Sequence, residues 1–347
     1  MSELPRFAFL VHPLSGLHRR VIGVRRGYLP MALGADGLGA PAGLICRPVV
    51  PGVAEGQVVS VPLLPDQMIG DQVVALEAMK RAVEDLDVNA VGLGSLCAVV
   101  AGRGTGLVDA LDGRGPPITT GASATAWAAA ENTLAVLRAR QARTVALIGI
   151  GGAVGGAVAR RLVGADVRVL AVCKGRAQVK KAARLGAHGV TLEEALAGAR
   201  VLVGASTNGG LVDPDALSEG TVVVDVALPA TLSSGPRPAG VIVLAGEAVT
   251  LPDGWRRGFW GWLYHGLAGY GPWQLYACVV EPLVMAVTGR AAPFSLGRQV
   301  DLDDLEAFAA GAAELGIRPR LAHGWREIPV GRLGGMDAAP ALPGPAT

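Results

Sequence analysis

The chain has 347 residues, a length that allows roughly two domains with a substantial core in each. Apolar residues make up 51% of the chain and charged residues 17%, which excludes an intrinsically disordered protein. The formal net charge of +2, without a long basic run, gives no reason to expect a nucleic-acid partner.

The first segment, MSELPRFAFLVHP, carries only a brief apolar run before His12, too short for a secretory signal. The cysteines stand far apart and form no C-x-x-C pair, a pattern typical of reduced thiols and not of a disulfide or zinc framework. There are four of them: Cys46, Cys97, Cys173 and Cys278. We therefore expect a cytoplasmic protein without a metal site.

The first 121 residues alternate between strand-like and helix-like segments. Strands are expected in the apolar runs 7–11, 44–50, 58–64 and 91–93. Residues 66–86 predict one amphipathic helix, capped by Asp66 and with its apolar side formed by Ile69, Val73, Leu76 and Val83. Thr119-Thr120-Gly121 then precedes a long helix over 122–140. The pattern predicts an α/β substrate domain over residues 1–121.

The segment RTVALIGIGGAVGGAVARRLV predicts a buried strand over 144–148, a glycine turn and a helix. Such a turn lets backbone N–H groups approach a pyrophosphate at the positive end of the helix, while a last glycine lets helix and strand pack closely. A structural glycine turn is the alternative, but the strand before and the helix after favour a nucleotide site. The predicted cofactor contacts are Gly149, Gly151, Gly152, Ala153, Val154 and Gly155.

The second strand of this domain, 167–172, ends at Cys173-Lys174-Gly175-Arg176. No acidic residue stands there to accept a hydrogen bond from a ribose 2′-OH, and Lys174 and Arg176 are suited to a 2′-phosphate. We therefore expect NADPH as the cofactor. The alternative is that these two cations are only solvated at the start of the next helix. Further strands over 201–205, 221–226 and 241–244 place Ser206 and Asp225 at strand ends as additional cofactor contacts. Residues 122–250 thus predict a Rossmann-like, doubly wound NADP-binding domain.

Residues 251–332 predict a C-terminal helical segment that packs on the N-terminal domain, followed by a loose tail over 333–347. The aromatic, glycine-rich stretch 255–273 is interrupted by glycines and a proline, which argues against a membrane span and favours burial or the lining of an apolar channel. Arginines at 19–26, 256 and 257 indicate either a solvated face or a docking patch for an acidic partner.

The order of the motifs over nearly the whole chain resembles the cyanobacterial long-chain acyl-ACP reductases, which form fatty aldehydes. The resemblance rests on FAFLVHPLSGLH, EGQVVSVPLLPDQM, ITTGASATAW, the glycine turn, VVVDVALPATL, YACVVEPL and PFSLGRQ. It implies NADPH-dependent reduction of an acyl thioester, carried by acyl carrier protein or coenzyme A, to an aldehyde. An acyl carrier protein is the implied partner, and a peripheral membrane contact is a further candidate.

The cysteine that this resemblance implies as nucleophile is Cys278. A thiol suits the chemistry because thioester exchange is nearly balanced and the enzyme thioester remains electrophilic. Glu281, three residues later, is expected on the same helix face, where it would orient the site or relay a proton. Pro282 lacks an N–H, so the helix is expected to kink or to begin there. A buried, inert core cysteine is the alternative for Cys278.

Two other functions remain open at this stage. An NADP-dependent dehydrogenase of a small hydroxy acid, resembling quinate and shikimate dehydrogenases, would share the two-domain α/β plan and use no cysteine. The N-terminal domain shows no obvious Lys–Asp pair for that chemistry. A nucleotide-binding pseudoenzyme would keep the glycine turn and lack the reaction. Acylation of Cys278 would separate the thioester reductase from both.

Overall fold

A computed structural model describes residues 3–26, 42–250, 275–323 and 326–333. The chain divides into two compact units. The first comprises Met1–Ala124, Thr250–Arg298 and Glu306–Ile317, and the second comprises Thr125–Val249, Gln299–Leu305 and Arg318–Thr347. The boundary between the first unit and the nucleotide domain therefore falls three residues after the predicted position of 121/122.

The first unit is built on a mixed sheet with strand order β2-β4-β1-β5-β6, and β3 pairs with β4. Its strands are β1 (Arg6–Val11), β2 (Gly43–Cys46), β3 (Val49–Val50), β4 (Ala54–Ser60), β5 (Ala90–Leu93) and β6 (Ile118–Thr119). β4, β1, β5 and β6 are mutually parallel, while β2 and β3 run antiparallel to β4. The carboxyl ends of the four parallel strands consequently share one edge of the sheet.

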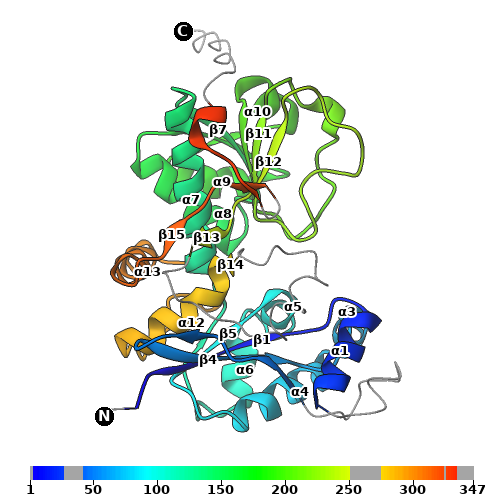
Figure 1. The fold of residues 1–347 in the computed structure, drawn as a ribbon. Helices are drawn as coiled ribbons and strands as arrows, with labels where there is room; N and C mark the ends of the chain where they lie inside the picture. Colours follow the sequence, from blue (N-terminus) through cyan, green and yellow to red (C-terminus); the bar gives the residue numbers. More distant parts are fainter. Residues whose placement is uncertain (1–2, 27–41, 251–274, 324–325, 334–347) are drawn as a thin grey trace. The chain divides into compact units, whose positions relative to one another are not determined.

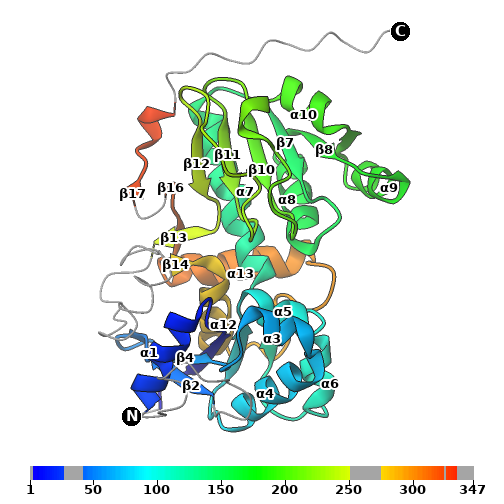
Figure 2. The ribbon, with the colours of Figure 1, turned by 90° about the vertical axis from the view of Figure 1, so that its right-hand side faces the viewer.

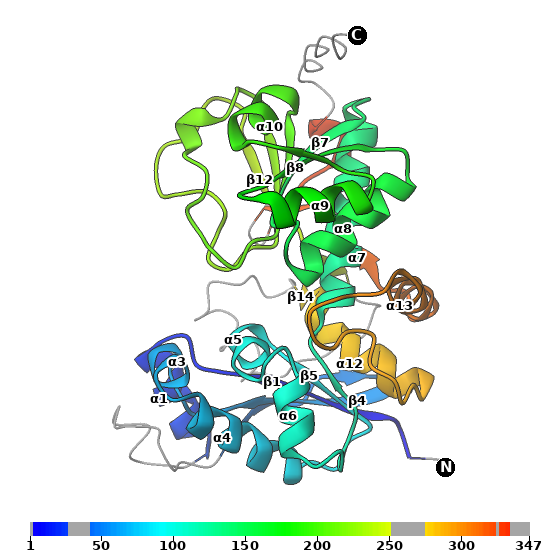
Figure 3. The same cartoon turned by 180° about the vertical axis from the view of Figure 1, so that it is seen from behind.

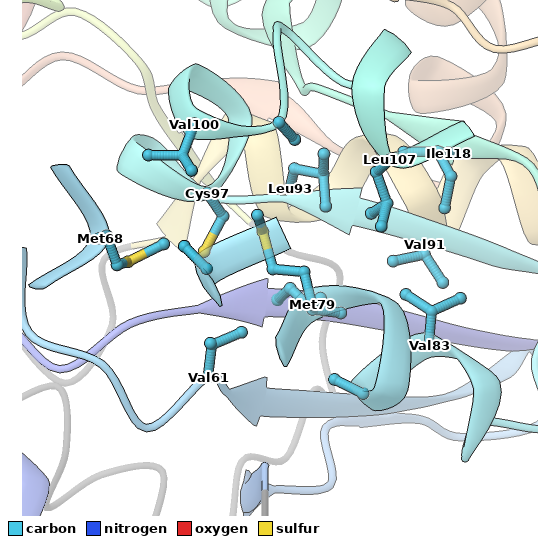
Figure 4. Close-up of a cluster of buried hydrophobic side chains, with 14 of the residues drawn as sticks. Val61, Met68, Met79, Val83, Val91, Leu93, Cys97, Val100, Leu107 and Ile118 are labelled. Atoms are coloured by element: carbon cyan, nitrogen blue, oxygen red, sulfur yellow. The ribbon is translucent and has the colours of Figure 1, made fainter. Parts of the chain in front are cut away.

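Helices cover both faces of this sheet (Figure 1). They are α1 (Gly16–Arg26), α3 (Pro65–Gly70), α4 (Gln72–Glu84), α5 (Ser95–Val100), α6 (Thr105–Ala110) and α12 (Ala277–Thr288), while most of α13 (Leu302–Glu314) belongs to this unit and packs on α12. On β1, Ala8 and Leu10 join the core shared with α3 to α6, which Figure 4 draws. On the other face, a Cβ added at Gly92 would lie 2.7 Å from both Phe9 and Pro282, so α12 packs directly on the sheet.

The single helix predicted over 66–86 is wrong. The structure has two helices, which meet at Asp71, and the side chain of Asp71 caps α4 by accepting from Val74 N at 3.0 Å. This break changes the helical phase, so Ile69 and Val73 are 60% and 78% exposed instead of buried. The buried side of α4 is formed by Ala75, Met79, Ala82 and Val83.

The second unit contains a fully parallel sheet with strand order β12-β11-β10-β7-β8-β9 (Figure 2). Its strands are β7 (Thr144–Ile148), β8 (Arg168–Val172), β9 (His188–Val190), β10 (Val201–Gly204), β11 (Val222–Asp225) and β12 (Ile242–Ala245). The direction of winding reverses between β7 and β10, which is the doubly wound pattern predicted from the sequence. The α/β, Rossmann-like fold class is confirmed.

Helices connect these strands and cover the sheet (Figure 3). They are α7 (Ala122–Ala139), α8 (Ala153–Gly164), α9 (Arg176–Arg184) and α10 (Leu192–Gly198), with a 3-10 turn η1 (Pro214–Ala216). Ala146 and Ile148 of β7 face the core that includes Ala195 of α10. None of the helices that the structure describes combines the length and apolar character needed to cross a lipid bilayer.

The C-terminal segment is shared between the two units, which differs from the prediction that all of 251–332 packs on the first. α12 does belong to the first unit. After α13, short elements belong to the second: β15 (Arg318–Pro319), β16 (Ala322–His323), β17 (Arg326–Glu327) and η2 (Val330–Arg332). Hydrogen bonds explain this placement, because Arg320 N donates to Ala248 O of β13 (Ala248–Thr250) at 2.9 Å and the His323 ring lies 2.6 Å from Val243 O.

Candidate functional site

The glycine turn lies at the carboxyl end of β7 and has the geometry of a pyrophosphate cradle. Gly149 has φ +103°, and a Cβ there would lie 2.9 Å from the backbone nitrogen of Ser206. A Cβ at Gly155 would overlap the carbonyl of Gly149, with the carbonyl carbon at 2.7 Å. The sequence prediction that Gly155 allows close packing of helix and strand is therefore confirmed. Both positions require glycine for backbone reasons.

The middle of the turn is open, in contrast to its buried end. Gly151 is exposed, Gly152 is the N-cap of α8, and Ala153 and Val154 form the first helical turn while remaining partly exposed. The first N–H groups of a helix have no acceptor within it and carry its positive partial charge. The N–H of Gly152 already donates to Gly149 O at 3.0 Å, so the helix-start donors that a dinucleotide phosphate would meet are those of Ala153 and Val154.

Three cations lie beside this turn. Lys174 and Arg176 are exposed, at the end of β8 and the start of α9. The third cation makes a contact that the sequence analysis did not predict: Lys181 Nζ, on α9, donates to Gly151 O and Gly152 O, each at 3.1 Å. A cation held on the carbonyl side of the cradle offsets the negative ends of those two peptide groups and fixes the turn against α9.

Ser206 and Asp225 lie at the same carboxyl edge of the sheet, yet Asp225 is occupied by its own loop. Its carboxylate accepts from Ala227 N at 3.0 Å, from Thr231 N at 2.8 Å and from Thr231 Oγ1 at 2.8 Å. Burial raises the pKa of Asp225, and these hydrogen bonds oppose the shift. The geometry gives Asp225 a loop-holding role, whereas the half-buried Ser206 accepts from Asn208 N at 3.1 Å.

In the first unit, Cys278 lies in the first turn of α12 and packs against Gly121. Gly121 has φ +74°, and a Cβ there would lie 2.7 Å from the Cα and 3.1 Å from the carbonyl oxygen of Cys278. The Thr119-Thr120-Gly121 segment follows β6, so Cys278 is placed at the carboxyl edge of the first sheet. The start of a helix favours a negative charge, which suits a nucleophilic thiolate.

Glu281, fully buried on α12, connects three segments that are distant in the sequence. Its carboxylate accepts from the hydroxyl of Thr119, from Ser295 Oγ at 2.6 Å and from Ala124 N at 2.7 Å. Gly121 supplies a further backbone hydrogen bond. Three of the motifs that carry the family resemblance, ITTGASATAW, YACVVEPL and PFSLGRQ, thus meet at one carboxylate.

Ser295 completes this network and was not singled out by the sequence. Its hydroxyl accepts from Ala122 N at 2.9 Å and lies 2.9 Å from Thr120 Oγ1, while its backbone carbonyl accepts from Thr120 N at 3.1 Å. Its neighbour Phe294 accepts from Ser123 Oγ at 2.6 Å and packs edge-on against Phe308 of α13. Because the hydrogen bonds to Ala122 and Thr120 span 173 and 175 residues, no local pattern could have indicated them.

These contacts identify Glu281 as a positioning residue. Burial raises its pKa, opposed by the hydrogen bonds from Ser295, Thr119, Ala124 and Gly121. Four donors fill the acceptor positions of the carboxylate, and they include the first backbone groups of α7, whose dipole favours a negative charge. Glu281 therefore fixes the Gly121 turn against Cys278.

Pro282 does not start a new helix, in contrast to one of the two alternatives we predicted. α12 begins at Ala277, with Tyr276 as its N-cap, and continues through Pro282 to Thr288. The missing N–H of a proline leaves the carbonyl four residues earlier, that of Cys278, without its usual helical donor. Pro282 instead packs its ring on Gly92 of β5.

The four cysteines differ in environment. Cys97 is fully buried, and burial raises its pKa to about 12; Cys46 is also buried. Cys173 is half-buried at the end of β8, and burial raises its pKa as well. Cys97 and Cys278 both lie in the first turn of a helix, but Cys278 is half-buried and packs beside the Gly121 turn. Inert core packing therefore describes Cys97 better than Cys278.

A second polar group at the carboxyl edge of the first sheet was missed by sequence reasoning. His12, His18 and Arg19 follow β1 and are all buried, with at most 6% exposure. Arg19 donates to Gln67 Oε1 at 3.4 Å, so this arginine is part of the unit and not of an exposed docking patch. Arg256, Arg257 and the aromatic stretch 255–273 lie outside the described residues.

Comparison with known proteins gives sequence relatives and distant structural likenesses. No protein-family model matches the chain. The chain is 29% identical over 275 residues to the aminotransferase PigE of Serratia sp. strain ATCC 39006, covering 72% of this chain and 31% of that protein. The chain thus spans about a third of the length of this curated relative.

The solved structures that are similar to this chain include two dehydrogenases. Shikimate 5-dehydrogenase of Thermus thermophilus, in complex with NADP(H) and shikimate, has a TM-score of 0.35 at 16% identity, covering 89% of this chain and 100% of that one. A 5,10-methylenetetrahydrofolate dehydrogenase from the silkworm Bombyx mori has a TM-score of 0.37 at 13% identity, covering 84% of this chain and 89% of that one.

Proposed function

We propose that this protein is an NADPH-dependent oxidoreductase that reduces an acyl thioester to an aldehyde through an acyl-enzyme on Cys278. The observation that carries the proposal is the placement of this cysteine: it begins a helix, and it packs against a left-handed glycine that a buried carboxylate holds in position. A core cysteine needs no such support, whereas a nucleophile must be held in a fixed orientation to react efficiently.

The glycine cradle would hold the pyrophosphate of NADPH, and Lys174 and Arg176 would bind its 2′-phosphate. The fit rests on the shape of the turn, because side chains at Gly149 or Gly155 would collide with the backbone, and on the exposed N–H groups of the first turn of α8. Bound there, NADPH supplies the hydride.

The chemistry at Cys278 balances without another redox partner. The thiolate adds to the carbonyl carbon of the acyl thioester, a new C–S bond forms, and the carrier's C–S bond breaks to release the carrier thiolate. Hydride addition to the acyl carbon then breaks the bond to Cys278, which regenerates the enzyme thiolate and releases the aldehyde. Two electrons reduce the acyl carbon, and the nicotinamide is the electron donor.

The sequence match to the aminotransferase PigE is compatible with an aldehyde product. Aminotransferases act on carbonyl compounds, which an aldehyde-forming reductase supplies. The region shared with PigE covers 31% of that protein, which leaves most of its length for the activity in its name. An acyl carrier protein or coenzyme A would deliver the acyl group to this chain.

The test is mass spectrometry of the intact protein after exposure to acyl thioesters of coenzyme A and of acyl carrier protein, without NADPH. The proposal expects one acyl adduct, located on the peptide containing Cys278, and its loss with release of aldehyde when NADPH is added. Cys278→Ser should abolish both, and Cys173→Ser, at the other half-buried thiol, should retain both. Undiminished aldehyde formation by Cys278→Ser would refute the covalent route.

A second candidate is the NADP-dependent dehydrogenation of a small hydroxy acid, and His12 favours it. This histidine is buried at the end of β1, and burial lowers its pKa, so a neutral imidazole is available to take a proton from a hydroxyl group. The single lysine of the first unit, Lys80, lies 3.9 Å from Glu84 on α4 and provides no Lys–Asp pair. Hydroxy-acid oxidation that survives Cys278→Ser but fails in His12→Ala would select this candidate.

A further inference from the structure

Glu247 is a carboxylate in the second unit that no step above uses. It stands two residues beyond β12, whose last residue, Ala245, pairs with Asp225 at the end of β11. Since all six strands of this sheet are parallel, Glu247 lies at the same carboxyl edge as the glycine turn. Ligands of open α/β sheets bind at this edge.

The position of Glu247 along this edge corresponds to one half of the dinucleotide. The glycine turn follows β7, and Lys174 and Arg176 follow β8, which places the adenosine half on that side of the reversal between β7 and β10. An extended dinucleotide would cross the reversal, so its nicotinamide half would lie toward β10, β11 and β12. Glu247 belongs to this second side.

Glu247 also differs from its neighbour Asp225 in its hydrogen bonds. Asp225 accepts three hydrogen bonds from its own loop, whereas Glu247 Oε2 is buried and receives none from the residues that the structure describes. The backbone next to Glu247 is fixed, because Asn132 Nδ2 donates to Gly246 O at 2.8 Å. A buried acceptor without a donor is costly unless a ligand supplies the donor.

Taking this proposed cofactor as given, we propose that Glu247 accepts a hydrogen bond from the carboxamide N–H of the bound nicotinamide. The carboxamide is the one strong neutral donor on that ring, and a carboxylate acceptor would fix which face of the ring is presented. Burial, with the negative charge of Asp225 as a smaller contribution, raises the pKa of Glu247 to about 7, and the backbone N–H of Glu247 itself, which donates to the carboxyl group, opposes the shift.

Calorimetric titration of the full chain at pH 8, where Glu247 is ionised, tests this assignment with three ligands. NADP⁺ carries the carboxamide, its 3-acetylpyridine analogue replaces the amide N–H groups by a methyl group, and 2′,5′-ADP lacks the nicotinamide half. In the unmodified protein NADP⁺ should bind roughly tenfold or more tightly than the analogue, since the hydrogen bond involves a charged acceptor. In Glu247→Leu the two dinucleotides should bind alike.

The affinity for 2′,5′-ADP should be the same in both proteins, which shows that the unit is intact in the variant. Glu219→Leu, an equivalent change just before β11 at the opposite edge of the sheet, should leave all three affinities unchanged. An equal loss of NADP⁺ and analogue binding in Glu247→Leu, or no loss, would overturn the assignment while leaving NADPH as the cofactor. Absence of binding of all three ligands to the unmodified protein would overturn the cofactor proposal as well.

Discussion

Gly121→Ala tests how closely the turn after β6 fits against Cys278. A Cβ at this position would lie 2.7 Å from the Cα of Cys278 and would overlap its Cβ. The obstructing atoms belong to the backbone and to the first side-chain carbon, so no rotamer change can remove the overlap. Gly121 also has φ +74°, a conformation that a residue with a Cβ rarely adopts.

The loss of stability expected in Gly121→Ala has two parts. A left-handed conformation costs a residue with a Cβ roughly 1–2 kcal/mol, and overpacking in a well-packed interior typically costs about 1–3 kcal/mol. Gly289 ends α12 with φ +64° and has nothing within 4 Å of its added Cβ, so Gly289→Ala incurs the first cost alone. Gly121→Ala should therefore lose about 2–5 kcal/mol and Gly289→Ala about 1–2 kcal/mol.

Hydrogen exchange of the amides of α12, followed by mass spectrometry, reports the free energy of local opening. We expect markedly faster exchange in Gly121→Ala than in Gly289→Ala, together with slower acylation of Cys278 in Gly121→Ala. Equal exchange in the two variants would mean that the turn can move away from Cys278 without cost. The claim that the turn fixes the nucleophile would then be wrong.

Three other results are expected. Replacing Lys174 and Arg176 by alanine should remove the preference for NADPH over NADH, with each contact contributing up to about 3 kcal/mol; equal affinities in the unmodified protein would contradict this. Gly155→Ala should destabilise the second unit in thermal unfolding because its Cβ meets the Gly149 carbonyl, whereas Gly164→Ala, with open space around it, should not. Because the pKa of Glu247 is raised, its contribution to the free energy of unfolding is fully present below pH 4.5 and is lost as the pH rises through about 7. The loss is at most about 3 kcal/mol, and Glu247→Gln should remove this pH dependence. Unchanged pH dependence in that variant would contradict the assignment of the shift to Glu247.

The nucleotide unit could be predicted from the sequence because its signals are local. β7 has the bounds that its β-branched run indicates, and the roles of Gly149 and Gly155 follow from contacts within a few residues or with the neighbouring strand. The contact of Lys181 with the turn was not predicted because it joins residues 29 and 30 positions apart, and no local pattern indicates which cation of α9 reaches the turn. Residues 66–86 were predicted as one helix because apolar residues recur at helical spacing on both sides of Asp71; the structure ends α3 at Gly70 and starts α4 at Gln72, with Asp71 capping α4.

The candidate site in the first unit was predictable only in part. Spacing placed Cys278 and Glu281 on one helix, and the family resemblance singled out the cysteine. The partners of Glu281 could not be derived from spacing, because Thr119 and Ala124 lie 162 and 157 residues away in the chain. Glu281 would occupy the same helical position whether it relayed a proton or held the structure. Only the donors that the fold brings to its carboxylate distinguish the two roles.

Those donors separate Glu281 and Glu247 by function. Glu281 receives four hydrogen bonds from groups that the fold itself supplies, so its carboxylate is satisfied and contributes by holding a turn in place. Glu247 has a buried oxygen with no donor among the described residues, so its folding cost is offset only when a ligand binds. By residue type alone, either glutamate could take part in the chemistry. The hydrogen-bond count reverses the order that proximity to Cys278 suggests: Glu281, near the proposed nucleophile, is satisfied by the fold, and Glu247, beyond β12, is the one that the proposed cofactor would meet.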